Sequence, residues 1–267
     1  MRGEGAFFAG LPDRWRGRLA CLLFLLLLVG IWQLLAMAEL WDETLFPSPT
    51  SVCESLRDGF ASGTLVAAIS ASLRRLFLGY GIALLIGIPL GLVLGRNRLL
   101  DDTVGSLAVG LQALPSICWL PLAVLWFGLS ETAMLFVIVM GSFMSLTLSI
   151  RDGVRAIPPL YIRAARILGA RGWQFYRHIV LPASMPAILT GAKLGWSFAW
   201  RSLMAAELLY VTTGVGSTLM TGRDLHDMPL VVAAMLVIVT IGLFFDRVLF
   251  KSAERYLHVR WGLGNGR

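Results

Sequence analysis

Charged residues are scarce in this chain. Asp, Glu, Lys and Arg make up 15% of its 267 residues, whereas a soluble globular domain averages about 25%. Hydrophobic residues account for 57%, which is more apolar surface than a water-soluble monomer of this size can bury. The composition therefore excludes a disordered chain and an ordinary cytosolic enzyme. It predicts an integral membrane protein built from helices, in which the many glycines and prolines are tolerated.

Cysteine and histidine are also rare, with three of each. Cys21, Cys53 and Cys118 lie far apart, and none is spaced from a histidine as zinc ligands are. The sequence lacks the G-x-x-x-x-G-K-S/T motif of nucleotide-binding loops and any Ser/His/Asp or Cys/His grouping. We therefore expect no catalytic residue, no metal site and no bound cofactor in the chain itself. Energy for any transport has to come from a partner or from an ion gradient.

Long apolar runs are what the chain has instead. A helix needs about 20 apolar residues to cross the hydrocarbon layer, and six stretches satisfy this, at residues 19–38, 76–94, 104–127, 132–150, 187–210 and 229–250. Pro115 and Pro121 interrupt the third stretch and predict a kink there, because proline removes a backbone donor. The stretches define a transmembrane domain over 19–250, with an N-terminal arm (1–18) before it and a tail (251–267) after it.

Positive charge indicates how these spans are oriented. Lys and Arg cluster in the arm, after the second span, after the fourth span and in the tail, whereas the other connections hold mostly Asp and Glu. Cytoplasmic loops carry the excess of positive charge, so both termini and the long 151–186 loop are predicted to be cytoplasmic. The first span, with Ala36-Met37-Ala38 at its end, also resembles a cleaved secretory signal. Its length and bulky residues favour an uncleaved span.

The segment before the second span has features of a membrane surface. A short helix is expected over residues 51–60, after a proline-containing turn. Arg74 and Arg75 follow at the predicted outer rim of the second span, where long basic side chains can anchor at the interface. Small residues recur along that span and suit close crossing with another helix; they are Gly79, Gly87, Gly91 and Gly95.

The 151–186 loop is the most informative segment. Two prolines end the helix that leaves the membrane, residues 160–168 then form an amphipathic helix, and Gly169 stands where a helix end requires a positive φ. A second amphipathic helix is expected over 173–181, closed by Pro182 and Pro186. Such a projection suits either of two roles, insertion into a groove of a soluble partner or adsorption to lipid headgroups.

Polar side chains inside the spans are candidates for a translocation path, because a charge in the bilayer usually faces a cavity or a partner. Arg201 lies about midway along the fifth predicted span, and its guanidinium suits a small anion. Glu207 lies six positions further on, and these two charges either brace adjacent helices or line the path. The path candidates are Gln112, Ser116, Trp119, Trp196, Trp200, Arg201 and Glu207, with packing as the alternative role for each tryptophan.

Several segments together resemble one family. Ala164-Ala165, Gly169 and Ile179-Val180-Leu181-Pro182 reproduce the spacing of the pattern E-A-A-x3-G-x9-I-x-L-P of ABC-importer permeases. Arg163 stands where that pattern has its acidic residue, so a salt bridge from that position cannot be carried over. Further similarities extend over residues 45–250 and point to the nitrate/sulfonate/taurine branch of binding-protein-dependent importers; they are Phe46–Pro49, Gly87–Gly91, Leu120–Leu122, Trp126–Gly128 and Ala205–Glu207.

The resemblance implies the all-α fold of a type I importer permease, with about six transmembrane helices and a cytoplasmic coupling helix. It implies a transport subunit in the plasma (inner) membrane of a bacterium, among membrane lipids, and neither an enzyme nor a binder of nucleic acid. ATP and Mg²⁺ would bind a separate cytoplasmic ATPase dimer. A second permease subunit, expected to be identical, would complete the path. An extracytoplasmic binding protein would deliver a nitrate-, sulfonate- or taurine-like anion. The residues assigned to the ATPase contact are Leu160, Arg163, Ala164, Ala165, Arg166, Leu168, Gly169, Ala170, Leu181 and Pro182.

The residues alone leave one alternative, an ion-coupled secondary transporter of a small solute. Such transporters usually contain inverted repeats and broken helices near the bilayer midplane. No convincing repeat relates residues 1–130 to residues 131–267.

Overall fold

The computed structural model describes residues 13–38, 40, 42, 44–210 and 212–260, and all the regular structure in them is helical. The predicted all-α fold is confirmed. In chain order the elements are α1 (Asp13–Met37), α2 (Pro49–Ala61), α3 (Thr64–Leu94), α4 (Arg98–Leu100), η2 (Asp101–Gly105), α5 (Ser106–Gln112), η3 (Ser116–Cys118), α6 (Trp119–Phe127), α7 (Glu131–Arg155), α8 (Pro159–Ile167), α9 (Gly172–Phe175), η4 (Tyr176–Val180), α10 (Leu181–Glu207), α11 (Val215–Asp224), α12 (Met228–Phe245), η5 (Asp246–Phe250) and α13 (Lys251–Arg260).

Five helical segments in the described residues are long and apolar enough to span a membrane: Leu19–Met37, Thr64–Leu94, Glu131–Arg155, Gly172–Glu207 and Met228–Arg255. A sixth span is possible in the bent pair Arg98–Gln112 and Ser116–Phe127. Each of the six predicted stretches overlaps one of these segments.

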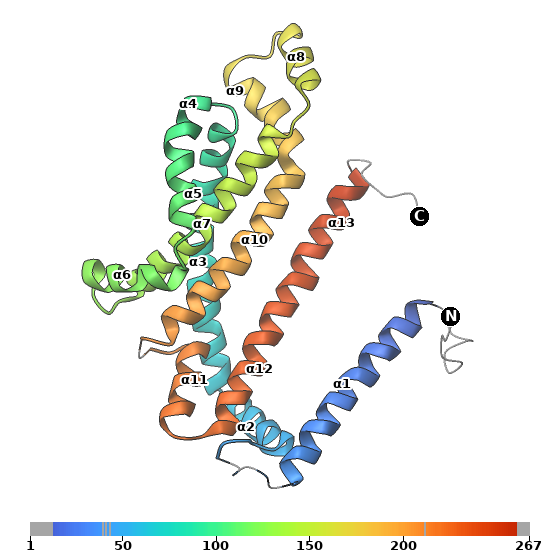
Figure 1. Cartoon of the computed structure of the whole chain (residues 1–267), viewed down its shortest axis with the longest axis vertical. Coiled ribbons are helices and arrows are strands. Elements are labelled where there is room, and N and C mark those ends of the chain that lie inside the picture. Colours follow the sequence, from blue (N-terminus) through green and yellow to red (C-terminus); the bar gives the residue numbers. More distant parts are fainter. Residues whose placement is uncertain (1–12, 39, 41, 43, 211, 261–267) are drawn as a thin grey trace.

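The third predicted span is not one kinked helix. Its two arms meet at 96°, and in Figure 1 α6 runs across the direction of α5. The break lies just before Ser116, at Pro115, whose backbone is extended (ψ 139°). Pro121 does not contribute to the bend, because it sits in the first turn of α6, where backbone N–H groups have no partner within the helix.

The core is formed where α7 packs between α3 and α10 (Figure 1). Leu76, Tyr80, Ile138 and Leu203 are among its buried side chains. The glycines predicted to allow a close crossing all face α7. A Cβ built on Gly91 would lie 2.7 Å from the carbonyl oxygen of Thr147, and those built on the other three would lie 2.5–2.8 Å from side chains of α7. The predicted close crossing is confirmed.

The N-terminal end of α3 differs from the prediction. The helix begins at Thr64, twelve residues before the predicted start of the second span, and so includes both arginines that were expected at its rim. Arg74 is exposed and pairs with Glu131 at 2.7 Å. The Arg75 side chain is only 5% exposed, because it turns into the protein to meet Glu207. Arg75 is therefore not an interfacial anchor. The short surface helix before α3 is present as α2.

The start of the fifth span also differs. The segment Gly172–Glu207 is one continuous helical stretch, so Pro182 and Pro186 do not close a separate helix. The π-helical turn Tyr176–Val180 lies immediately before Pro182. A π turn widens the helix and shifts its hydrogen bonds, which makes room for a proline ring without ending the helix.

The two ends of the chain lie beside the core. No residue in the apolar stretch of α1 is buried within this chain, and α1 leans away from the bundle in Figure 1. Trp32 Nε1 donates to the carbonyl oxygen of Pro47 at 3.0 Å and holds α1 near α2. The last helix continues past the predicted boundary at residue 250 to Arg260. Residues 1–12 of the predicted arm and 261–267 of the predicted tail lie outside the described residues.

Candidate functional site

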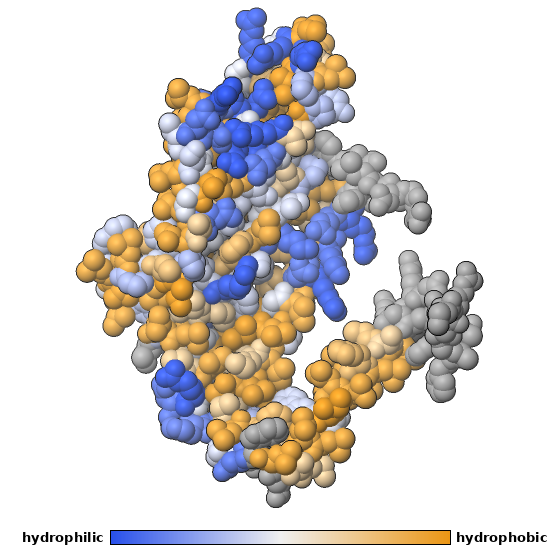
Figure 2. All heavy atoms as spheres, in the orientation of Figure 1, coloured by the Kyte–Doolittle hydropathy of each residue, from blue (hydrophilic) through white to orange (hydrophobic). Residues whose placement is uncertain are grey.

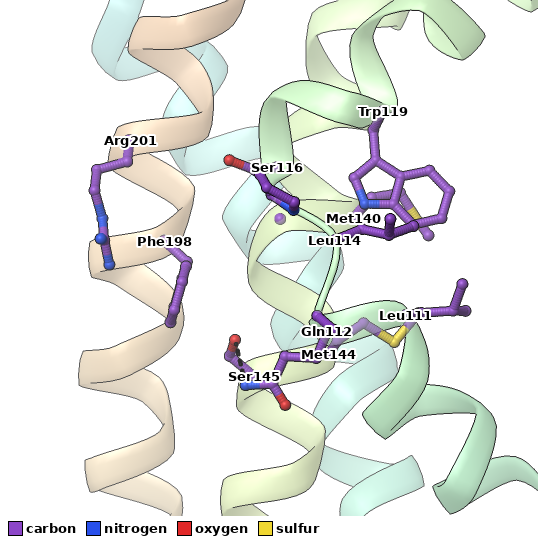
Figure 3. A pocket seen from close by; sticks show the side chains of 13 residues that line it. Leu111, Gln112, Leu114, Ser116, Trp119, Met140, Met144, Ser145, Phe198 and Arg201 are labelled. Carbon is purple, nitrogen blue, oxygen red and sulfur yellow. Dashed lines mark hydrogen bonds between the residues drawn. The ribbon is translucent and has the colours of Figure 1, made fainter.

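A cavity of about 280 Å³ lies at the bend between α5 and η3, against α7 and α10 (Figure 3). We call it the hinge cavity. Its lining residues are Leu111, Gln112, Ala113, Leu114, Pro115, Ser116, Trp119, Met140, Gly141, Met144, Ser145, Phe198 and Arg201. The polar members Gln112, Ser116, Ser145 and Arg201 come from four different elements, and the Gln112 side-chain amide donates to Ser145 Oγ at 3.3 Å.

Arg201 carries the charge at this cavity. Its Nε donates to the carbonyl oxygen of Ser197 at 3.1 Å, and its guanidinium lies 4.5 Å from the centroid of the Phe198 ring. Among the described residues it makes no ion pair. Because α10 ends at Glu207, Arg201 lies about 9 Å from the C-terminal end of the helix, and not midway as predicted. Its charge is thus open to a ligand.

Four of the seven predicted path residues line the hinge cavity: Gln112, Ser116, Trp119 and Arg201. Trp196 and Trp200 do not, since they are 5% and 8% exposed and belong to the core. Trp196 packs against Tyr80 and Phe245, with ring centroids 5.3 and 4.7 Å apart. For these two tryptophans the packing role is the one that the structure supports.

Glu207 also lies away from the hinge cavity. Its carboxylate is fully buried and accepts hydrogen bonds from Ser72 Oγ at 2.8 Å, Arg75 Nη1 at 2.9 Å and the backbone N–H of Gly216 at 3.0 Å. It therefore joins α3, α10 and α11. Of the two roles expected for Glu207, its position fits the brace between adjacent helices, and its charge partner is Arg75 instead of Arg201.

Several residues that line the hinge cavity are not predicted from the sequence. Met140, Met144 and Ser145 come from one face of α7, at spacings of four and five residues, and Phe198 lies three residues before Arg201 on α10. Residues three and four apart share a helix face, so the neighbours of Arg201 on its own helix could have been found. The residues of α7 could not, because nothing local indicates which face of α7 meets α5.

A second candidate site is the projection formed by α8, at one end of the molecule (Figure 1). Gly169 has φ +82°. The N–H of Ala170 bonds to the carbonyl of Ala165, and the N–H of Gly169 bonds to that of Arg166. These two bonds form the Schellman motif that ends a helix with a left-handed residue. The positive φ predicted at Gly169 is confirmed.

The projection presents both apolar and basic side chains to its surroundings. Leu160, Ile167 and Leu168 are 70%, 86% and 85% exposed. Figure 2 shows hydrophilic residues gathered at this end of the molecule, above a mainly hydrophobic body. Of the predicted contact residues, Leu160, Arg163, Ala164, Arg166, Leu168 and Gly169 are exposed, Ala170, Leu181 and Pro182 are half-buried, and Ala165 is buried.

A cavity of about 730 Å³ separates α8 from the start of α10. Ala164, Leu168, His178 and Pro182 are among its lining residues. Ile162 of α8 packs against the buried cluster that includes Val154 and Val180, and an exposed helix face remains for a partner. Among the described residues, no three His, Cys, Asp or Glu side chains are grouped as a metal site.

Known proteins are similar to this chain in sequence. Residues 87–256 match the family described as the binding-protein-dependent transport system inner membrane component. A putative ABC transporter permease of Methanocaldococcus jannaschii is 34% identical over 235 residues, which cover 86% of this chain and 88% of the relative. The taurine transport system permease of Escherichia coli is 31% identical over 238 residues (87% and 86%), and the nitrate import permease of a Synechocystis species is 27% identical over 231 residues (83% of each).

The family match favours an ABC importer over the ion-coupled alternative. It also means that the chain is a transport subunit and not an enzyme, with ATP hydrolysis left to a separate subunit. The resemblance drawn from the coupling loop is confirmed. From the all-helical bundle, the projection at α8 and these matches, we conclude that the chain belongs to the inner membrane components of binding-protein-dependent transport systems, as a multi-pass permease subunit of an ABC importer.

Proposed function

We propose that the chain forms the membrane path for a small anion of the nitrate, sulfonate or taurine class. The observation that carries the proposal is the guanidinium of Arg201 at the hinge cavity, which forms no ion pair with a described residue. The names of the taurine and nitrate permeases among the relatives support the same class of solute.

The chemistry of the cavity suits such a solute. A guanidinium offers several donors in one plane and binds oxyanions through paired hydrogen bonds. The Gln112 amide and the Ser116 hydroxyl add neutral donors. A volume of about 280 Å³ holds a small polyatomic anion but not a peptide. Because one arginine supplies all the charge, binding stays weak enough for the anion to leave, as conduction requires.

The experiment is uptake of nitrate, taurine and an alkyl sulfonate into proteoliposomes that contain the chain with its ATPase and binding protein. We expect Arg201→Gln to lower uptake of the transported anion about tenfold or more, since hydrogen bonds to a charged group contribute about 1.5–3 kcal/mol. Arg201→Lys keeps the charge but not the planar donors, so its uptake should lie between that of the wild type and that of Arg201→Gln.

A matched control is Arg98→Gln, which removes an equal charge from a side chain that is 94% exposed and outside the cavity. It should transport as the wild type does. Wild-type uptake by Arg201→Gln would overturn the assignment of this cavity to the anion, whereas equal uptake of neutral solutes would overturn the solute class.

We further propose that α8 docks in a groove of a cytoplasmic ATPase that binds ATP and Mg²⁺. The exposed Leu160, Ile167 and Leu168 support this, because an amphipathic helix binds a groove through such apolar positions. In the proposed assembly two identical permease chains pair with two ATPases, an extracytoplasmic binding protein delivers the anion, and both permease termini face the cytoplasm. The arginine-rich loops support that orientation.

A further inference from the structure

An apolar groove of about 340 Å³ lies outside the proposed anion path, where α3 ends near the start of the fifth span. We call it the α3–α9 groove. Its lining residues are Pro89, Leu92, Val93, Trp173, Tyr176, Arg177 and Leu181. Apart from the guanidinium of Arg177 and the hydroxyl of Tyr176, these side chains are apolar, and the volume is in the range of small-molecule sites.

The position of the groove along the helices matches the boundary between acyl chains and headgroups. Pro89 and Val93 belong to the last two turns of the span Thr64–Leu94, and Trp173 and Tyr176 begin the span Gly172–Glu207. Tryptophan and tyrosine gather at this boundary in membrane proteins, since their rings are apolar and their tips are polar. Trp173 is 75% exposed, which leaves most of its ring surface open to lipid.

Two cations lie at or beside the groove. Arg177 lines it directly. Arg96 follows one turn after Leu92, and its guanidinium lies 5.7 Å from the centroid of the Phe175 ring, next to Tyr176. In the part of the chain that the structure describes, neither arginine forms an ion pair, and neither lies in the hinge cavity. The charge of these two arginines is therefore not neutralised beside the apolar α3–α9 groove.

We propose that the α3–α9 groove binds an anionic phospholipid. One acyl chain lies along Leu92, Trp173 and Leu181, and the phosphate lies between Arg96 and Arg177. Basic side chains at this depth attract anionic headgroups, and their apolar stems can lie along the acyl chain. A zwitterionic lipid has no net charge to complement the two arginines, so the groove selects by headgroup.

The test uses the full chain in vesicles of unlabelled phosphatidylcholine. One set of vesicles contains a fraction of phosphatidylglycerol brominated on its acyl chains, and the other contains the same fraction of brominated phosphatidylcholine. Bromine quenches tryptophan fluorescence at contact, and the difference between the wild type and Trp173→Phe isolates Trp173 from the other eight tryptophans. We expect brominated phosphatidylglycerol to quench Trp173 more strongly at equal mole fraction. Arg96→Gln and Arg177→Gln should each lower that preference about fivefold.

Arg98→Gln is the matched control, since it removes the same charge two residues beyond Arg96 from a side chain outside the groove. It should leave the preference unchanged. Equal quenching by the two brominated lipids, no quenching of Trp173, or an Arg98→Gln effect as large as that of Arg177→Gln would each overturn the proposal. An excess of soluble glycerol phosphate should not reduce the preference; if it does, the arginines bind free phosphate and the groove takes no part.

Discussion

At the scale of single residues, Glu207 is a carboxylate near the end of an apolar helix whose surroundings balance its charge. Ser72, Arg75 and the Gly216 N–H satisfy its oxygens. Arg75 also donates to the carbonyl of Thr213 at 2.7 Å. Both charged groups are buried, and Arg75 also pairs with the exposed Glu131 at 3.2 Å, so Glu207 is the buried partner of Arg75. The cluster therefore fixes the loop between α10 and α11 against α3.

We predict that Glu207→Ala lowers the free energy of unfolding by about 3–5 kcal/mol, because it removes the buried counter-charge of Arg75 and leaves only the exposed Glu131 beside it. The double variant Arg75→Leu/Glu207→Leu should lose less than the sum of the two single variants, since it removes both charges together. Denaturant unfolding of the purified chain in micelles measures this. If the losses of the single variants simply add, the pair is not a coupled unit.

How far the site could be predicted from sequence differs from residue to residue. Arg201 is predicted because a charge within an apolar run requires a reason, and Gln112 and Ser116 because they are polar residues inside a predicted span. The partners of Glu207 are not predicted, because they are 132 and 135 residues away in sequence. These partners, Ser72 and Arg75, precede the predicted start of the second span at residue 76, and no local pattern reveals such a contact.

At the scale of helices, the crossing of α3 and α7 depends on glycine at the contact. We predict that Gly91→Ala destabilises the chain by about 1–3 kcal/mol, because its Cβ would meet the carbonyl oxygen of Thr147 and Cβ of Ile150 (2.8 Å), so the helices have to separate. Gly81→Ala on the same helix meets nothing within 4 Å and should be neutral or stabilising, since alanine favours a helix. Thermal unfolding compares the two. Equal effects would show that the crossing tolerates a wider spacing.

The end of α8 makes a second prediction at this scale. Gly169→Val should uncouple ATP hydrolysis from uptake and leave folding nearly intact. A β-branched residue is strained at φ +82°, yet a Cβ there meets no atom within 4 Å, so the change is confined to the turn. Uptake and ATPase rates of the reconstituted complex measure the coupling ratio.

Gly63→Val is its control, because Gly63 has φ +77° and equally open surroundings, but lies between α2 and α3. It carries similar strain and should remain coupled. Normal transport by Gly169→Val, or uncoupling by both variants, would contradict the role assigned to α8.

The sequence predicted some elements better than others. Residues 160–169 contain their own signals, since proline begins the helix and glycine ends it, and the structure follows them. The continuation through Pro182 was not foreseen, because it depends on a π turn that no residue pattern specifies. Likewise Pro115 predicts a kink in the third span, but the angle of 96° depends on how α6 packs against α7 and Tyr210.

At the scale of the whole molecule, the chain leaves large apolar surfaces without a protein neighbour. The apolar stretch of α1 is unburied and that of Met228–Arg255 is 22% buried, compared with 61% for Glu131–Arg155. Lipid or a second subunit has to cover them. A helix in the bilayer satisfies its own backbone hydrogen bonds, but its apolar side chains still need apolar contact. The chain is one subunit of an ABC importer, and Glu131–Arg155 is the most buried of the apolar segments that the structure describes.

The central claim is that a separate ATPase, acting on α8, drives an anion through this chain. Its most direct test is uptake of labelled anion into proteoliposomes that contain the chain with or without its ATPase and binding protein, with ATP or with an imposed ion gradient as the energy source. The account predicts uptake only when the ATPase, the binding protein and hydrolysable ATP are all present. Uptake by the chain alone on an ion gradient, at a rate unaffected by ATP, would contradict it.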